Sequence, residues 1–233
     1  MRLLMGMHYR EGWGVPQSFS EARRWMEIAA LSNSPAALTA LGDLYRRGQG
    51  SPADPERAMP LYIRAAALGH TDAMNLIGMA YMRGQGVTQN TGEGIRWLTQ
   101  ATDLGNPYSA FHLGRAFLTG WGVQPDLRTA LAYFRLSAQR NYLGAYTYLG
   151  DVLTAADAGD LRNLPAGYAN YIIARDAAIL RDTIDSKKEL VEIEAKITAL
   201  LGVMNTSERT EGEVIAQDWI AQYGLLDFNL VHE

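Results

Sequence analysis

A glycine recurs at one fixed interval from the N-terminus to residue 150. Successive members of the series are 36 residues apart without a single insertion: Gly6, Gly42, Gly78, Gly114 and Gly150. The residue before each of these glycines is apolar, and the residue three positions after it is aromatic in the first four copies. A fixed period of this length is typical of repeat proteins, in which each copy is one supersecondary unit that buries its apolar face against its neighbours.

Each copy reads as two helices joined by a tight turn. In the second copy, apolar residues at helical spacing predict an amphipathic helix over 36–47. Gly48 and Gly50 end it, because glycine adopts the left-handed cap conformation without steric cost. Asp54 is a good N-cap for a second helix, which is expected to run to about Leu68.

The same pattern divides most of the chain into repeats. We expect five helix-turn-helix units, at about 1–35, 36–71, 72–107, 108–143 and 144–181. The fifth has an irregular turn, TAADAGD, without the Gly-x-Gly pair, which is typical of a terminal unit. Residues 182–233 are predicted to form a helical cap and tail, with helices over 184–203 and 207–223 and Trp219 as an anchor. The predicted fold is all-α: a right-handed α/α superhelical solenoid with C-terminal capping helices.

The recurring glycine lies inside a predicted helix, where it costs about 1 kcal/mol relative to alanine. Close packing would offset this cost. We expect a bulky residue of the paired helix, of the Trp25 or Trp97 kind, to pack on the bare backbone.

The third copy carries the motif most completely, at Ala73, Ile77, Gly78, Tyr81, Gly84, Gly86, Val87, Trp97 and Ala101. This motif resembles the Sel-one-like repeat, a relative of the tetratricopeptide repeat with a slightly longer unit. The tetratricopeptide repeat has a period of about 34 residues. The resemblance covers about residues 1–155. It implies a bacterial protein that acts as an adaptor, scaffold or regulator by binding another protein.

Composition excludes several other functions. The net charge of −4 gives no electrostatic reason to bind nucleic acid, and no apolar run approaches the about 20 residues of a membrane helix. There is no cysteine, and the four histidines lack metal-ligand spacing. Three acidic residues near the fifth turn, Asp151, Asp157 and Asp160, are read as a solvated loop, with a weak calcium site as the alternative. We therefore expect no catalytic residue, metal or cofactor.

The first helices of successive repeats are expected to line a concave face. Aligning them in register predicts these partner-binding residues: Met7, Arg10, Asp43, Arg46, Met79, Met82, Phe111, Arg115, Leu118 and Asp151. Apolar side chains flanked by arginines suit a groove for a peptide or helix. The alternative is that the apolar members pack between adjacent repeats. Trp13 and Trp121, in the turns, are further interaction candidates.

The predicted function is binding of a partner protein or peptide, without enzymatic activity. The alternatives are a cell-envelope hydrolase-type enzyme and a self-assembling structural scaffold. No capping helix precedes the first repeat, so its end should expose apolar surface. We favour truncation as the cause and expect a monomer, with dimerisation through this end as the alternative. No signal peptide is present in this chain, which leaves the compartment open: periplasm if the N-terminus was trimmed, and cytoplasm otherwise.

Overall fold

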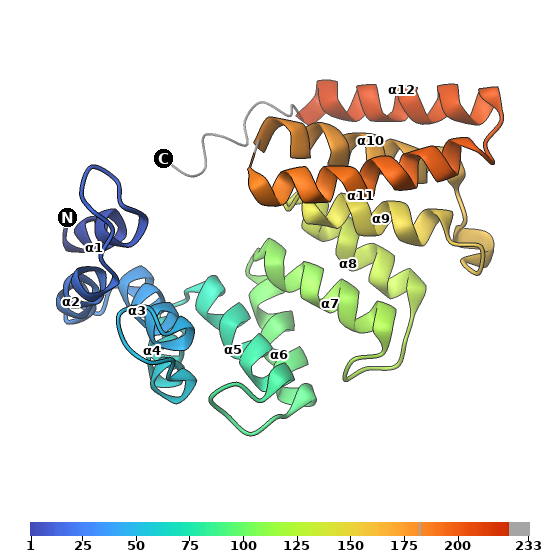
Figure 1. Ribbon diagram of the computed structural model, residues 1–233. Coiled ribbons are helices and arrows are strands. Elements are labelled where there is room, and N and C mark those ends of the chain that lie inside the picture. The colour runs from blue at the N-terminus through green and yellow to red at the C-terminus, as the bar shows by residue number, and fades with distance from the viewer. Residues whose placement is uncertain (182, 224–233) are drawn as a thin grey trace. The chain divides into compact units, whose positions relative to one another are not determined.

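The computed structural model describes residues 1–181 and 183–223, and the regular structure of these residues is entirely helical (Figure 1). This confirms the predicted all-α class. Besides a 3-10 helix at Gly159–Leu161, the helices are α1 (Arg2–Glu11), α2 (Phe19–Ala30), α3 (Pro35–Arg47), α4 (Pro55–Ala67), α5 (Thr71–Arg83), α6 (Thr91–Asp103), α7 (Pro107–Thr119), α8 (Leu127–Gln139), α9 (Gly144–Thr154), α10 (Leu164–Arg181), α11 (Ile184–Leu201) and α12 (Thr206–Tyr223). The predicted tail after Tyr223, including His232, lies outside the described residues.

The chain forms two compact units. Met1–Leu113 and Trp121–Gln124 belong to the first, and Gly114–Gly120 and the chain from Pro125 onward belong to the second. In the first unit, α1 packs with α2, α3 with α4 and α5 with α6, and each pair contacts the next through α2 with α3 and α4 with α5. Consecutive helix pairs therefore stack as a solenoid of repeats, as the 36-residue period predicted.

Turn chemistry sets where each second helix begins. Gly48 ends α3 with a φ of 69°, in the left-handed region that the sequence predicted for it. The backbone N–H of Asp54 then donates to the carbonyl of Tyr45 at 2.8 Å, and the Asp54 side chain accepts from the N–H of Arg57. The hydrogen bond from Asn90 to Tyr81, at 2.9 Å, closes the next turn in the same way. In these repeats, the backbone hydrogen bond between the N-cap residue and the aromatic residue thus closes the turn.

The recurring glycine lies against a bulky side chain of its hairpin partner. A Cβ atom built on Gly42 would lie 2.5 Å from Cε1 of Tyr62, and one on Gly78 would lie 2.8 Å from Cγ of Leu98. Our prediction that Trp25 or Trp97 fills this role is wrong by one position, because the residue that follows each of them along the helix faces the glycine. Close packing is nevertheless what the bare backbone permits.

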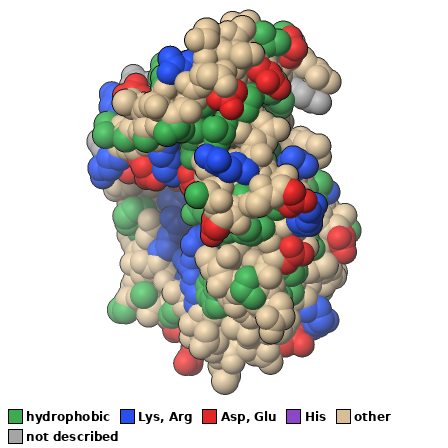
Figure 2. Space-filling view, turned by 90° about the vertical axis from the view of Figure 1, so that its right-hand side faces the viewer, with side chains coloured by type: hydrophobic (Ala, Val, Ile, Leu, Met, Phe, Trp, Pro, Cys, Tyr) green, Lys and Arg blue, Asp and Glu red, His purple; other side chains and the backbone are tan. Residues whose placement is uncertain are grey.

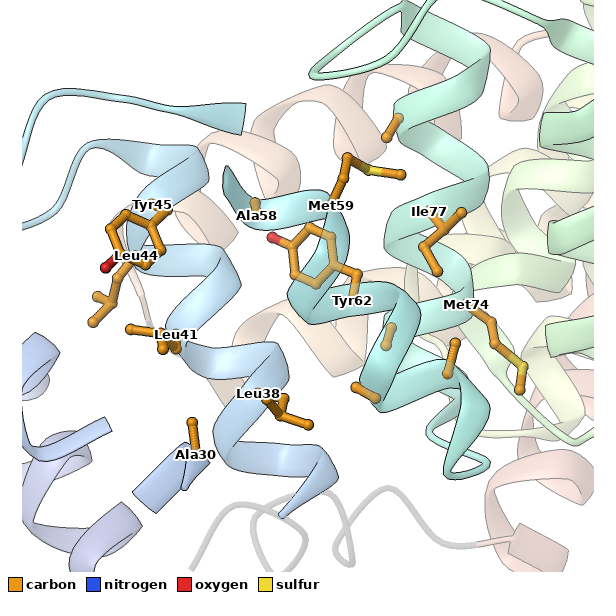
Figure 3. Close-up of a cluster of buried hydrophobic side chains, with 14 of the residues drawn as sticks. Ala30, Leu38, Leu41, Leu44, Tyr45, Ala58, Met59, Tyr62, Met74 and Ile77 are labelled. Atoms are coloured by element: carbon orange, nitrogen blue, oxygen red, sulfur yellow. The ribbon is translucent and has the colours of Figure 1, made fainter. Parts of the chain in front are cut away.

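The core of the first unit forms where α3, α4 and α5 meet. Tyr62 and Leu38 are at most 1% exposed, and Ile77 of α5 is fully buried in the same cluster. Figure 3 shows these side chains directed into the space between the three helices. Each repeat therefore contributes to a core that it shares with the next. At the other end of the unit, Leu4 of α1 is 56% exposed, as the sequence led us to expect for the first repeat.

In the second unit, α9 and α10 follow the design of the earlier hairpins. A Cβ atom on Gly150 would lie 2.4 Å from Cε1 of Tyr171, and the N–H of Asn163 donates to the carbonyl of Leu153 at 2.8 Å. The turn is one residue longer than in the other copies, since Asn163 follows Asp126 by 37 positions. We interpret this pair as a fifth repeat. Helices α11 and α12 both pack on α10.

Candidate partner-binding groove

One side of α3 is buried and the other is open. The buried side carries Ala37, Leu38, Leu41 and Leu44. The open side carries Ala36, Ala40, Asp43 and Arg47, whose spacing of four, three and four residues places them in one row along the helix. The two small alanines leave space above the backbone, and the charged pair follows at the C-terminal end of the row.

This row forms part of a groove in the first unit, with a volume of about 460 Å³. Helices α1, α3 and α5 and the start of α7 contribute to it. The lining residues are Arg10, Ala36, Thr39, Ala40, Asp43, Arg47, His70, Asp72, Asn75, Leu76 and Tyr108. A second, more polar hollow of about 270 Å³ shares Arg10, Asp43 and Arg47 with it.

Hydrogen bonds fix the polar wall of the groove. Nδ1 of His70 lies 3.1 Å from the hydroxyl of Thr39 and accepts from the backbone N–H of Ala73, at the start of α5. Asp72 accepts from the side-chain amide of Asn106 at 2.7 Å. Because adjacent repeats hold these groups in place, this part of the wall is preorganised for a ligand.

Asp43 is the centre of a charged cluster at the opposite end. Its Oδ1 accepts from Nε and Nη2 of Arg46, at 3.0 and 2.7 Å, and from the hydroxyl of Tyr62 at 3.1 Å. Nη2 of Arg47 lies 3.4 Å from Oδ2. Burial of the phenol, together with the negative charge of Asp43, raises the pKa of Tyr62 well above its usual value. Tyr62 therefore stays protonated and donates this hydrogen bond.

We expect Tyr62→Phe to lower the free energy of unfolding by about 1–2 kcal/mol, because it removes a hydrogen bond to a charged acceptor. Urea titration followed by circular dichroism measures the change. In an Asp43→Asn background the loss should be smaller, since the acceptor is then neutral. Equal losses in the two backgrounds would contradict the assigned bond.

The second unit contains a related cluster around Asp151, which is 108 residues, or three periods, after Asp43. The hydroxyl of Tyr171 donates to Asp151 at 2.8 Å, and Nζ of Lys196, on α11, lies 2.8 and 3.0 Å from its two oxygens. Asp151 therefore ties α11 to α9 and α10. This role differs from the partner-binding role that the sequence suggested for it.

The prediction of a binding role is wrong for three apolar residues of the predicted face. Met79 and Phe111 are both 7% exposed and Met82 is 1% exposed, so all three belong to the core. Met82 fills the space above Gly94, where a Cβ atom would lie 2.6 Å from Cγ of Met82. These residues are therefore packed in the core and not in a groove, although Met82 packs within its own repeat and not between adjacent repeats as the alternative supposed.

The other predicted residues divide between groove and scaffold. Arg10 and Asp43 line the groove. Met7 packs against the core of the first unit, and Arg46 is held by Asp43. The remaining three are outside this groove, namely Arg115, Leu118 and Asp151.

The sequence interpretation named two of the eleven groove residues and missed nine, among them Ala40, Arg47, Leu76 and Tyr108. Ala36, Asp72 and Tyr108 are related by the 36-residue period, as are Ala40 and Leu76. Their register was therefore available in the sequence, but the choice of row was wrong.

The turn tryptophans do not line the groove. Trp13 is 51% exposed, and its ring meets His8 edge-on at 6.1 Å between centroids. Trp121 is half-buried. Both stay interaction candidates at the level of prediction.

Side chains of both charge signs also lie on the face drawn in Figure 2. Figure 2 shows Lys and Arg side chains among Asp, Glu and hydrophobic ones on the face that includes α11 and α12. Asp160, near the irregular turn, pairs with Arg128. Within residues 1–181 and 183–223, no three His, Cys, Asp or Glu side chains gather where they could hold a metal ion. None of the helices described is both long and apolar enough to span a membrane.

Comparisons with known proteins agree with the repeat architecture. The model of the Sel1 repeat family matches residues 2–34, 35–70, 71–106 and 107–142. A search of curated proteins finds no match. A Sel1 repeat protein from Oxalobacter formigenes has a similar crystal structure, with 26% identity, a TM-score of 0.72, and coverage of 93% of this chain and 86% of that one.

Two further solved structures share the fold at lower identity. The immunity protein Pa5087 from Pseudomonas aeruginosa has 19% identity and a TM-score of 0.53, and the match covers 84% of this chain and 82% of that one. The antigen c5321 of uropathogenic Escherichia coli has 20% identity and a TM-score of 0.50, and the match covers 96% of this chain and 53% of that one.

Proposed function

Since the chain belongs to the Sel1 repeat family, whose members typically mediate protein–protein interactions, we propose that the groove of its first unit binds a segment of a partner protein. The observation that carries this proposal is the groove itself. Residues from successive repeats line one hollow of about 460 Å³, with a floor of alanine and leucine side chains and a polar rim. Ligand sites commonly combine an apolar floor with a few fixed polar groups in this way.

The residue types at the rim support a protein partner. Tyr108 is 44% exposed, and the side chain of Arg47 is 57% exposed. Tyrosine and arginine are enriched among the residues that contribute most to protein interfaces. Asp72, which also lines the groove, would repel the phosphate backbone of a nucleic acid.

Site-specific photo-crosslinking tests the proposal. A benzophenone amino acid placed at Leu76 in the groove, or at Ile63 on α4 as the control, is activated in cells, and the adducts are identified by mass spectrometry. Ile63 is 48% exposed and outside the groove. We expect a defined adduct with one other protein from position 76 and none from position 63.

Two results would contradict the proposal. One is an adduct that forms equally from both positions, which would indicate nonspecific contact. The other is an adduct of twice the mass of the chain as the sole product at position 76, which would favour self-association and the scaffold alternative.

A groove-filling substitution should abolish binding without affecting the fold. Ala36 is exposed and lines the groove, so Ala36→Trp is expected to change the free energy of unfolding by less than about 0.5 kcal/mol while it occupies the binding space. The matched control is Ala67→Trp, at an exposed position of α4 outside the groove. Calorimetry with the purified partner that crosslinking identifies should show loss of binding only for Ala36→Trp. Unchanged affinity of Ala36→Trp for this partner would contradict the assignment of the groove.

A further inference from the structure

The charges around Asp43 do not balance. Asp43 accepts three hydrogen bonds at Oδ1, two of them from Arg46, and Nε of Arg10 lies 2.5 Å from Glu11. Arg47 is the third cation of the group, and its contact with Asp43 is long, at 3.4 Å, while its side chain is mostly exposed. Three arginines therefore face two carboxylates, which leaves one positive charge in excess at this end of the groove.

The related cluster in the second unit shows how the chain balances such a site. Thr154 occupies the register position of Arg46, and Ala155 occupies that of Arg47, so α9 supplies no cation to Asp151. A neighbouring helix supplies it instead, because Lys196 of α11 contacts both oxygens of Asp151. An aspartate at the register position of Asp43 that has no arginines on its own helix is thus neutralised by a cation from a helix that packs against it.

The first unit has the opposite requirement. Its row aspartate already has two arginines from its own helix, so a segment that packs there meets surplus positive charge. Building on the proposed function, we infer that the partner segment carries an aspartate or glutamate side chain that pairs with Arg47, next to an apolar side chain that lies over Ala40 and Leu76. Planar, bidentate pairing of a carboxylate is the interaction that arginine favours.

The far end of the groove fixes the direction of the segment. Asp72 lies there beside Tyr108, and its carboxylate already accepts a hydrogen bond from Asn106. A second carboxylate at this end would be repelled. The acidic residue of the partner is therefore placed at the Arg47 end only.

Selection from a random-peptide display library on the purified full chain tests the inference. The variants are Arg47→Glu and the matched control Arg83→Glu, one period later, which is also exposed but does not line the groove. Peptides selected on the wild type should be enriched in Asp and Glu. They should bind Arg47→Glu about tenfold or more weakly and Arg83→Glu equally well. Selection on Arg47→Glu should instead enrich Lys and Arg.

The outcomes separate this inference from the proposed function. Peptides that lack acidic residues, bind Arg47→Glu unchanged and are blocked by Ala36→Trp would overturn the acidic partner while supporting the groove. Peptides that bind Arg47→Glu and Ala36→Trp as well as they bind the wild type would overturn both the acidic partner and the groove as the binding site. Binding should also weaken as the salt concentration rises from about 0.05 to about 0.5 M, because a largely exposed ion pair is screened. Salt-independent binding would contradict the inference.

Discussion

Met82→Asp is expected to lower the free energy of unfolding by about 4 kcal/mol or more. The side chain is 1% exposed and lies on the bare backbone at Gly94, where a Cβ atom would be 2.7 Å from its sulfur. The substitution leaves a cavity and buries a carboxylate, and each effect costs several kcal/mol. Urea denaturation followed by circular dichroism gives the change.

The adjacent residue provides the control. Arg83 is exposed at the end of the same helix, and Arg83→Asp should change the free energy of unfolding by less than about 0.5 kcal/mol. If Met82→Asp were as stable as this control, Met82 would be a surface residue and the original prediction of its role would be restored.

Gly78→Leu should lower the free energy of unfolding by about 3 kcal/mol, with a matching fall in the melting temperature. A Cβ atom at Gly78 would lie 2.8 Å from Cγ of Leu98, 2.9 Å from its Cδ2 and 3.1 Å from the carbonyl oxygen of Gly94. Leu98 is fully buried, so neither it nor the backbone can move away cheaply. Overpacking of this kind typically costs about 1–3 kcal/mol, and the further side-chain atoms of leucine place this case at the upper end.

Two further variants make this prediction specific to packing. Leu98→Ala in the Gly78→Leu background should recover part of the loss, because it removes the opposing side chain. A Cβ atom built on Gly92 of α6 would lie 3.5 Å from Oδ1 of Asn90, which is an ordinary contact distance. Gly92→Ala should therefore stabilise the protein by up to about 1 kcal/mol, because alanine favours the helix more than glycine does. Similar losses at both glycines would contradict the packing explanation, because close approach predicts a loss at Gly78 and helix propensity predicts a gain at Gly92.

The period of the sequence predicted the helices almost to the residue. The helix expected over 36–47 is Pro35–Arg47, and the second helix of that repeat ends at Ala67 where about Leu68 was expected. Glycine and N-cap chemistry acts within a few residues, so a single repeat contains all the information needed. The repeat boundaries follow from local physics in the same way.

The choice of binding face could not be made as securely. A first helix contacts its hairpin partner and the helices of adjacent repeats, so it is buried on more than one side, and apolar periodicity alone does not show which row is open. Met79 and Met82 were therefore placed on the surface. One available signal was Gly94, which replaces the alanine of the first, second and fourth copies and makes room for Met82.

Side-chain pairs between residues far apart in the chain could only partly be predicted from the sequence. Aspartate follows the recurring glycine in the two repeats whose hairpin partner is tyrosine, at Asp43 with Tyr62 and Asp151 with Tyr171. That correlation could have been found from the repeat alignment. Lys196 could not, because it lies outside the repeats and 45 residues from Asp151, where no period relates the two.

We propose that the open row of α3 in the first unit holds the partner. Amide hydrogen exchange of the full chain, measured with and without the partner that crosslinking identifies, tests this placement. We expect added protection in residues 36–47 and 70–77, which include the groove residues of α3 and α5, and no change in the second helices, α2 and α4. Protection confined to α2 and α4, with 36–47 unaffected, would show that the partner binds the opposite face and that the groove is not its site.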